Sequence, residues 1–373
     1  MEAELEEEQK IKLFLCGDVM LGRGIDQAMQ HSVDPVIYES YVKDARDYIK
    51  LAEKVNGTIG IPVAHKYIWG EALKKWKEEA PDFRLINLET SITTNEEPWP
   101  RKGIHYRMHP KNIEALKVAE IDHCSLANNH VLDWGREGLL ETLKTLKEAD
   151  FSFSGAGENY QAALKPSVLK MGKKELLVFS FGSRSSGIPP DWAAKKEISG
   201  VNYIENLSAE EQKKVVEEVK KFSSAEDLVV FSIHWGRNWG YEIPSAQKEF
   251  AHRLIDGAGV DIVFGHSSHH PLGIEVYKNK LIIYGAGDFF NDYEGISGME
   301  QFRGELTLMY FPEMEVSTGN LIALKMIPLE IKNFQLKKAS KKDIEWIYKT
   351  LQRESTKLGA TLELKNKELW LQW

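Results

Sequence analysis

Short apolar runs rich in β-branched and aromatic residues recur along the chain, and most of them end in glycine or polar residues. Runs of this kind are typical of strands that are buried on both faces of a sheet. The pattern predicts strands at Ile11–Cys16, Arg84–Leu88, His123–Ala127, Leu176–Phe181, Leu228–Ile233, Ile262–Phe264 and Leu281–Tyr284, with further strands at Glu305–Phe311 and Leu321–Ile327.

Segments between several of these strands place apolar residues three and four positions apart, which is the spacing of one helix face. Ser208 opens one such segment with Ser-Ala-Glu-Glu, a capping-box pattern. The alternation of strands and helices predicts a layered α/β fold. The predicted helices are Lys111–Ala119, Gly138–Glu148, Ser208–Phe222 and Ser245–Asp256.

The pattern changes from about Val316 onward. One or two strands are followed by a charged amphipathic helix at Lys341–Leu358 and a short tail that carries tryptophan. We therefore expect a main domain over residues 10–315 and a C-terminal strand and helix appendage, residues 316–373, packed on it.

Composition and charge fit a folded globular protein whose ligand is not nucleic acid. Hydrophobic residues make up 42% of the 373 residues, and the formal net charge is −8. Binding along a nucleic acid requires a basic face, and no dense lysine and arginine stripe is present. Cys16 and Cys124 lie far apart within apolar runs, so we expect two core thiols rather than a disulfide.

The first ten residues, MEAELEEEQK, are acidic and lack the apolar stretch of a signal peptide. No run approaches the ~20 apolar residues that span a bilayer. We expect a cytoplasmic location for the chain as written, and an exported or membrane-associated one if the natural protein is longer.

Candidate metal ligands gather where the predicted strands end. Because ligands of open α/β sheets bind outside the carboxyl ends of the strands, these residues are expected to lie close together. Carboxylate, amide and imidazole donors without cysteine suit Mn²⁺, Fe or Zn²⁺. The residues at successive strand ends are Asp18, then Asn87 and Glu89, then Asn128, Asn129, His130 and Asp133, then His234, and finally His266, His269 and His270.

Each of these motifs alone has a simpler explanation. Gly-Asp after a strand is usually a turn that caps a helix, and Asn-Asn-His is compatible with an Asx turn. A single histidine such as His234 is more often a core or surface residue than a ligand. Their occurrence at five strand ends in one chain favours a metal site.

Longer stretches resemble the bacterial capsule-synthesis family for poly-γ-glutamate, the CapA-like or PGA_cap proteins of the calcineurin-like metallophosphoesterase superfamily. The resemblance runs from about residue 11 to 292 and implies two mixed β-sheets packed as a sandwich with flanking helices. The matching stretches are GDVMLGR (17–23), INLETSIT (86–93), HYRMHPKNIEAL (105–116), SLANNHVLDWG (125–135), SIHWG (232–236) and AHRLIDGAGVDIVFGHSSHHPLGIEVYKNKLIIYGAGDFF (251–290).

The resemblance implies roles for individual residues. His130 would protonate the leaving group and Asp133 would orient it. Two divalent ions (Mn, Fe or Zn) would clamp the reacting oxygens and lower the pKa of a water. The implied metal ligands are Asp18, Glu89, Asn129, His234, His266 and His269.

Two departures from the superfamily pattern affect the first metal. The usual Asp-x-His is Asp18-Val19-Met20 here, so one imidazole is missing. The usual Gly-His-x-His is Gly265-His266-Ser267-Ser268-His269, and His270 competes with His269 for the ligand role. A site one ligand short would bind its first ion weakly or hold only one ion.

Other residues are weaker candidates. Arg23, Arg107 and Arg184 suit recognition of carboxylate or phosphate, although ordinary ion pairs explain them equally well. Trp235, with Trp239 and Tyr241 after it, would wall a substrate pocket or pack in the core. Asp288 and Asp292 are expected to support the ligands or form a turn.

The leading hypothesis is a metal-dependent hydrolase in which an activated water attacks a phosphoester or amide, with His130 as the general acid. Its substrate would be anionic: poly-γ-glutamate, a phosphoester or a γ-glutamyl compound. One alternative is a non-catalytic subunit that binds polyglutamate and supports its synthesis or export with a polyglutamate synthase complex. The other is a hydrolase for a small molecule in the cytoplasm.

Overall fold

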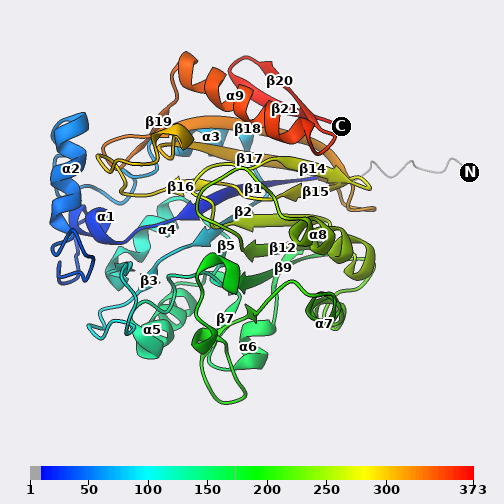
Figure 1. The fold of residues 1–373 in the computed structure, drawn as a ribbon, viewed down its shortest axis with the longest axis horizontal. Coiled ribbons are helices and arrows are strands. Elements are labelled where there is room, and N and C mark those ends of the chain that lie inside the picture. Colours follow the sequence, from blue (N-terminus) through cyan, green and yellow to red (C-terminus); the bar gives the residue numbers. More distant parts are fainter. Residues whose placement is uncertain (1–9, 173) are drawn as a thin grey trace, which may run out of the picture.

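Two mixed β-sheets pack face to face, and helices cover their outer surfaces (Figure 1). This arrangement is seen in a computed structural model that describes residues 10–172 and 174–373. It confirms the predicted fold class, an α/β sandwich of two mixed sheets with flanking helices.

The larger sheet has the strand order β20-β21-β18-β17-β1-β2-β5-β6, with β16 paired to β1 and β19 paired to β18. Strand β1 is parallel to β2 and β16 and antiparallel to β17. The strands are β1 (Lys10–Val19), β2 (Phe83–Leu88), β5 (His123–Ser125), β6 (Ser152–Ser154), β16 (Asp288–Phe290), β17 (Leu306–Glu315), β18 (Leu321–Ile331), β19 (Leu336–Lys338), β20 (Thr361–Lys365) and β21 (Glu368–Gln372).

The smaller sheet has the order β11-β9-β12-β13-β15-β14, with β8 paired to β9. Its central strands β9, β12, β13 and β15 are parallel. The strands are β8 (Ser167–Met171), β9 (Lys174–Ser183), β11 (Tyr203–Ile204), β12 (Leu228–His234), β13 (Ile262–His266), β14 (Ile274–Tyr277) and β15 (Lys280–Ile283). Two short ladders, β3 (Ser91–Ile92) with β4 (Arg107–Met108) and β7 (Ala156–Gly157) with β10 (Gly200–Val201), lie outside both sheets.

Three apolar layers hold the sandwich together, and the alternation of side chains along each strand explains them. On β1, Leu13 and Leu15 face the space between the sheets, while Phe14 and Cys16 face the helices outside the larger sheet. On β12, Val230 faces the same inner space and Phe231 packs under the outer helices. Strands buried on both sides therefore appear in the sequence as continuous apolar runs.

The helices divide between the outer faces. Helices α1 (Arg23–Ala28), α2 (Arg46–Asn56), α3 (Glu71–Glu79), α4 (Glu114–Val118) and α5 (Gly135–Glu148) contribute to the layer on the larger sheet. Helices α6 (Tyr160–Leu164), α7 (Ala209–Lys220) and α8 (Ser245–Ala258) cover the smaller sheet, and α9 (Lys341–Thr356) closes one end of the inner layer. Within the described residues, no helix is both long and apolar enough to cross a membrane.

Every predicted strand is present, with ends shifted by a few residues; β5, for example, stops at Ser125. The predicted helix at Lys111–Ala119 divides into a 3₁₀ turn at Pro110–Ile113 and α4. Ser208 caps α7, and Cys16 and Cys124 are buried free thiols, as expected. Helices α1, α2, α3 and α6 were not predicted.

The C-terminal segment continues the larger sheet. Strand β18 pairs with β17 along most of its length, and the tail after α9 forms the hairpin β20–β21. Residues after 316 thus share hydrogen bonds and core with the main sheet, and the expected domain boundary there stays a prediction.

Candidate metal centre

Two rows of polar side chains face each other across the space between the sheets. In the larger sheet, Asp18 on β1 stands in register with Asn87 on β2. In the smaller sheet, His234 at the end of β12 stands in register with His266 at the end of β13. Because these positions are the carboxyl ends of parallel strands, the sequence-distant residues meet at one edge, as predicted.

Asp18 lies at the centre of this arrangement and is fully buried. Its Oδ1 accepts a hydrogen bond from Asn87 Nδ2 at 2.7 Å and lies 3.5 Å from Nδ1 of His266. Its Oδ2 accepts the backbone N–H of Ser267 at 3.2 Å. Ser267 has a φ of +95°, a strained value for a residue with a side chain, and strain of this kind concentrates at functional sites.

Glu89, Asn129 and His234 form the second part of the site. His234 Nε2 lies 3.1 Å from Asn129 Oδ1 and 3.7 Å from Glu89 Oε1. One ligand atom each of Asp18, Glu89 and His234 lies within 4.8 Å of the others, a spacing that could hold a metal ion. Asn128, one residue earlier, instead donates from its amide to Asn87 Oδ1 and to the carbonyl of Leu88, and so fixes the loop.

Only one of the two ring nitrogens of His266 is available to bind a metal. Its Nε2 lies 3.0 Å from Ser232 Oγ, which orients the ring. Its buried Nδ1 has no hydrogen-bond partner among residues 10–172 and 174–373. An unpaired buried nitrogen beside a carboxylate is costly unless a further group, such as a cation, occupies the gap. The donors present therefore fit the divalent ion that the resemblance implies.

The pKa values agree with a site built for a cation. Burial, and next the Asp288 carboxylate, raise the pKa of Asp18 to about 7. Burial and the Asp18 carboxylate raise the pKa of Glu89 well above its usual value. Burial lowers the pKa of His266 to about 3 and that of His234 well below the usual value, so both rings are neutral, the form that binds metals.

His130 and Asp133 pair next to this cluster, as the sequence predicted. His130 Nδ1 lies 2.6 Å from Asp133 Oδ2, and its Nε2 faces Glu89 Oε1 at 4.0 Å. The ring of Tyr106 stacks on that of His130 at 3.8 Å, and the Tyr106 backbone N–H donates to Asp133. The carboxylate and the stacked ring together fix the orientation of the imidazole.

Lys102 is a member of the site that the sequence did not reveal. Its Nζ lies 2.6 Å from Asp133 Oδ1 and 3.2 Å from His130 Nδ1. Burial, and next the Lys102 charge, lower the pKa of His130 well below its usual value. Lys102 lies in a loop without helical or strand periodicity, so nothing in the local pattern distinguishes it from a surface lysine.

His269 and His270 separate in the structure. His269 Nδ1 lies 2.9 Å from Asp288 Oδ1, and its Nε2 lies 3.0 Å from the Asn238 amide. His270 accepts the backbone N–H of Gly240 and stacks on Phe302 at 4.6 Å, so it is held as a packing residue. Of the two competing histidines, only His269 faces the acidic cluster, that is, the buried carboxylates of Asp18, Glu89 and Asp288.

Two of the predicted substrate-binding arginines are committed elsewhere. Arg23 is buried and makes ion pairs with Glu39 and Asp292 beneath Tyr48. Arg107 donates to backbone carbonyls of Asp34 and Asn95 and lies 3.7 Å from the ring of Trp134. We infer that both arginines serve the fold rather than the substrate, because their guanidinium groups are already occupied.

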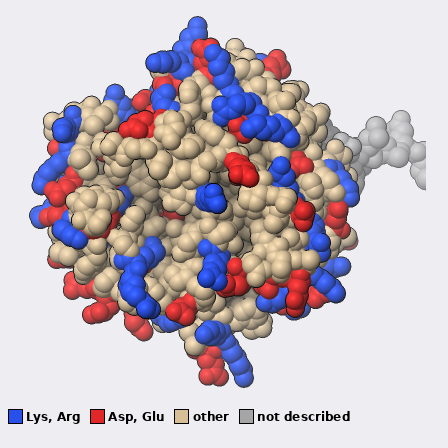
Figure 2. All heavy atoms as spheres, viewed as in Figure 1, with Lys and Arg blue, Asp and Glu red and all other residues tan. Residues whose placement is uncertain are grey.

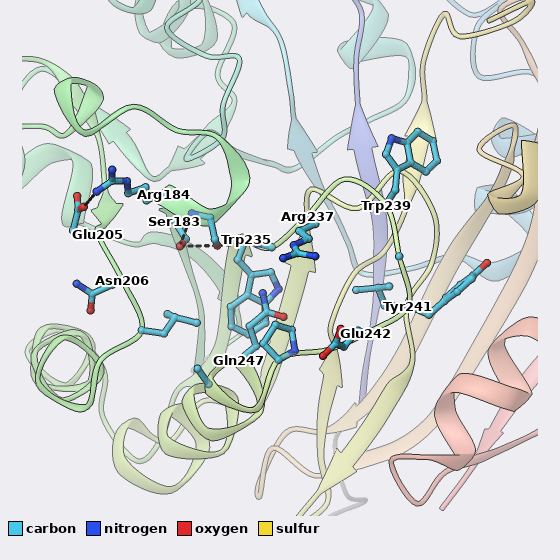
Figure 3. Close-up of a pocket in the computed structure, with 17 residues that line it drawn as sticks. Ser183, Arg184, Glu205, Asn206, Trp235, Arg237, Trp239, Tyr241, Glu242 and Gln247 are labelled. Carbon is cyan, nitrogen blue, oxygen red and sulfur yellow. Dashed lines mark hydrogen bonds and ion pairs between the residues drawn. The ribbon is translucent and has the colours of Figure 1, made fainter. Parts of the chain in front are cut away.

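Arg184 and Trp235 do line a cavity, of about 710 Å³, that begins where β12 ends. Figure 3 shows Arg184 paired with Glu205 on one side and Trp239 and Tyr241 on the other. Arg237, Trp235 and Gln247 lie between them. Within the described part of the chain, Arg237 makes no ion pair.

A second cavity of about 370 Å³ opens directly onto the acidic cluster. Its lining includes Glu89, Lys102, Asn129, His130 and His269. On the face seen in Figure 2, acidic and basic side chains are intermingled, so an anion is attracted by individual groups rather than by a broad field.

Comparisons with known proteins agree on one family. The model described as "Bacterial capsule synthesis protein PGA_cap" matches residues 12–293. A Mycobacterium tuberculosis protein named probable polyglutamine synthesis accessory protein is 44% identical over 354 residues, covering 94% of this chain and 92% of that protein. The capsule biosynthesis protein CapA of Bacillus anthracis is 24% identical over 364 residues, covering 97% of this chain and 78% of that protein.

Among solved structures, one described as a novel phosphatase from Mycoplasma pneumoniae aligns with a TM-score of 0.47 at 14% identity. The alignment covers 89% of this chain and 96% of that one.

Proposed function

The chain belongs to the PGA_cap family of bacterial capsule synthesis proteins, and we propose that it is a metal-dependent hydrolase that acts on an anionic substrate in polyglutamate synthesis or processing. The family links the chain to capsule and polyglutamate synthesis, in agreement with the resemblance of its sequence motifs. The reaction, the metal and the substrate are the parts that we propose.

One observation carries the proposal. Donors from strands far apart in the sequence converge next to a histidine that is held by its own carboxylate. A protein that only grips carboxylates has no need of an oriented His130 with Nε2 directed at Glu89. Nucleophile activation beside a positioned proton carrier is the arrangement that hydrolysis requires.

The residues that would hold divalent cations are Asp18, Glu89, Asn129, His234 and His266. The bound cations would supply Lewis-acid activation of the scissile group and of water. This donor set of carboxylate, amide and imidazole favours Mn²⁺, Fe or Zn²⁺. The surrounding apolar layers exclude bulk water and hold the donors rigidly.

His130 would carry the proton to the leaving group. Asp133 accepts from Nδ1 and so leaves Nε2 directed into the cavity that opens onto Glu89. Without substrate the ring is neutral, because burial and Lys102 lower its pKa. An anionic group bound beside it would raise that pKa and favour the protonated form, which couples proton delivery to substrate binding.

The cavity that begins at the end of β12 would accommodate the rest of the substrate. Arg237 offers a guanidinium without an ion pair among the described residues, and Trp235 and Trp239 offer apolar walls. A chain of methylene groups and carboxylates, such as poly-γ-glutamate or a γ-glutamyl compound, has this mixed character. A phosphoester would use the same positive charges.

Asp133→Asn is the decisive variant, because it keeps the side-chain shape and leaves the proposed ligands unchanged. Hydrolysis of aryl phosphoesters and of γ-glutamyl peptides would be measured with Mn²⁺, together with metal content. We expect kcat to fall by ~10²–10⁴-fold with metal content unchanged, because His130 loses its orienting carboxylate. The exposed Asp191→Asn serves as the control for the same chemical change.

Failure of the metal-loaded wild-type protein to hydrolyse either substrate class would instead support a second function, a non-catalytic subunit that binds polyglutamate beside a synthase. Two observations favour this candidate. Met20 replaces an imidazole of the superfamily pattern. The M. tuberculosis relative carries the name of an accessory protein.

A further inference from the structure

Asp288 extends the row of polar side chains on the larger sheet. Strand β16 lies parallel to β1, with Asp288 in register with Asp18, and Asn87 stands in register on the other side of Asp18. Side chains at paired positions of neighbouring strands lie on the same face of a sheet. Asp288, Asp18 and Asn87 therefore form one row, directed at His266 and His234.

This row concentrates negative charge in the interior. Asp18, Glu89 and Asp288 are each at most 3% exposed. Among residues 10–172 and 174–373, the ion-pair partners of these three carboxylates are all histidines. The nearby cations Lys102 and Arg23 bond to other acids, Asp133 and Asp292. Buried carboxylates without a full positive partner are unfavourable, and a divalent cation compensates them.

A second observation, independent of the acidic cluster, marks the same place. Nδ1 of His266 is buried, lacks a partner within the described chain, and lies 3.5 Å from Asp18 Oδ1. Its other nitrogen is held by Ser232, so the ring is oriented with its free nitrogen toward the row. Metal-binding histidines are typically oriented in this way, by a hydrogen bond to the ring nitrogen that does not bind the metal.

We propose that Asp288 is a direct ligand of the first divalent cation, together with Asp18 and His266. It would thereby replace the imidazole that is absent at Met20. The assignment rests on the metal centre of the proposed function and deepens it. A carboxylate in place of an imidazole shifts the preference of this site from Zn²⁺ toward harder ions such as Mn²⁺.

His269 becomes a positioning residue in this arrangement. Its Nδ1 contacts Asp288 Oδ1, and the Asn291 amide donates to Oδ2 at 2.7 Å. Each carboxylate oxygen has two acceptor sites, so both contacts leave room for a metal bond. The other nitrogen of His269 lies 3.0 Å from the Asn238 amide. In the converse arrangement, Asp288 would only orient His269, and His269 would bind the metal. His269 would then have to use Nε2, the nitrogen that contacts the Asn238 amide, as the ligand atom.

The test measures the affinity of the full chain for Mn²⁺ by calorimetry and the number of bound ions by elemental analysis. The electron paramagnetic resonance spectrum of the bound Mn²⁺ is also recorded. We expect Asp288→Asn to weaken one Mn²⁺ site more than ~100-fold, beyond the loss typical of an outer partner, and to remove the signature of coupled ions. His269→Ala should weaken the same site by less. Asp261→Asn, which changes a buried carboxylate directly before β13 in the smaller sheet, should change neither.

Unchanged Mn²⁺ affinity and stoichiometry in the Asp288→Asn protein would overturn the proposal. So would equal losses in Asp288→Asn, His269→Ala and the double variant, since Asp288 would then act only through His269. Circular dichroism verifies that each variant is folded. A wild-type chain that binds no Mn²⁺ would refute the metal centre itself, whereas one that binds Mn²⁺ without hydrolysing substrate would refute only the reaction.

Discussion

His234 and His130 offer a matched pair of substitutions that separates metal binding from proton transfer. Both side chains are buried, and both place Nε2 near the same oxygen of Glu89, at 3.7 Å for His234 and 4.0 Å for His130. They differ in their other contacts. His234 also meets Asn129 Oδ1 and lies near Asp18, whereas His130 is tied to Asp133 and stacked on Tyr106.

The expected magnitudes follow from these contacts. Loss of an outer partner of a metal ligand typically costs 10–100-fold in affinity, and loss of a ligand should cost at least as much. We therefore expect His234→Ala to weaken Mn²⁺ binding by at least ~10–100-fold, or about 1.4–2.7 kcal/mol. His130→Ala removes none of the proposed donors, so affinity should stay within about threefold while kcat falls by ~10²–10⁴-fold.

Calorimetric titration with Mn²⁺ measures the first effect, and substrate hydrolysis at saturating metal measures the second. His252→Ala is a suitable control, because His252 pairs with Glu275 and stacks on Tyr277 away from the site. Equal loss of Mn²⁺ affinity in the His130 and His234 variants would refute the division of roles, and His130 would then have to be counted among the ligands.

Three further predictions concern stability and ionisation. Mn²⁺ at 100 times its Kd should raise the free energy of unfolding of the metal-free protein by about 2.7 kcal/mol; an unchanged Tm would count against a site formed only in the folded state. Lys102→Met should raise the pKa of His130, since after burial the Lys102 charge is the main cause of its lowering. Histidine NMR titration measures this, and a pKa that stays or falls would contradict the assignment. Arg23→Met should destabilise the fold by about 3–5 kcal/mol in denaturant, because Asp292 and Glu39 stay buried without their partner, and leave KM unchanged. A raised KM with normal stability would contradict this and show that Arg23 contributes to substrate binding.

Much of the sandwich could be predicted because its central strands are buried on both faces. The run Leu228–Ile233 fills the inner layer with Val230 and the outer layer with Phe231, and Ser232 is its one polar residue. The polar residues that follow such a run then stand out. This is why the positions of Asp18, His234 and His266 could be anticipated.

The elements that were not predicted lack this contrast between an apolar run and the polar residues that follow it. Helix α2 does carry a signal, since Tyr48, Ile49 and Ala52 form a buried face, but charged residues separate them in the sequence. Strand β16 has only three residues, and its pairing with β1 joins segments some 270 positions apart. Local pattern says nothing about such a register, so Asp288 could be seen as a supporting residue but not as a neighbour of Asp18.

The arginines show the opposite error. The sequence predicts that Arg23 lies in a loop at the strand edge, where a guanidinium would suit an anionic ligand, whereas the structure places it at the start of α1. Its partner Glu39 comes from a segment with no recognisable motif, and Asp292 lies 269 positions away, where the sequence indicates only a supporting or turn residue. Together they hold Arg23 in the interior. Sequence placed the residue at the correct edge, but only tertiary contacts decide whether a charge faces the cavity or the core.

The position of β1 in the middle of the larger sheet constrains the order in which the protein can be assembled. Its antiparallel neighbour β17 begins at Leu306, and the neighbour that carries Asp288 begins only a short distance earlier. During synthesis, therefore, β1 must wait until the segment that contains β17 has been made before both of its edges are paired. The proposed metal site around Asp18 can therefore be completed only late in synthesis, after the segment that carries Asp288 has been made.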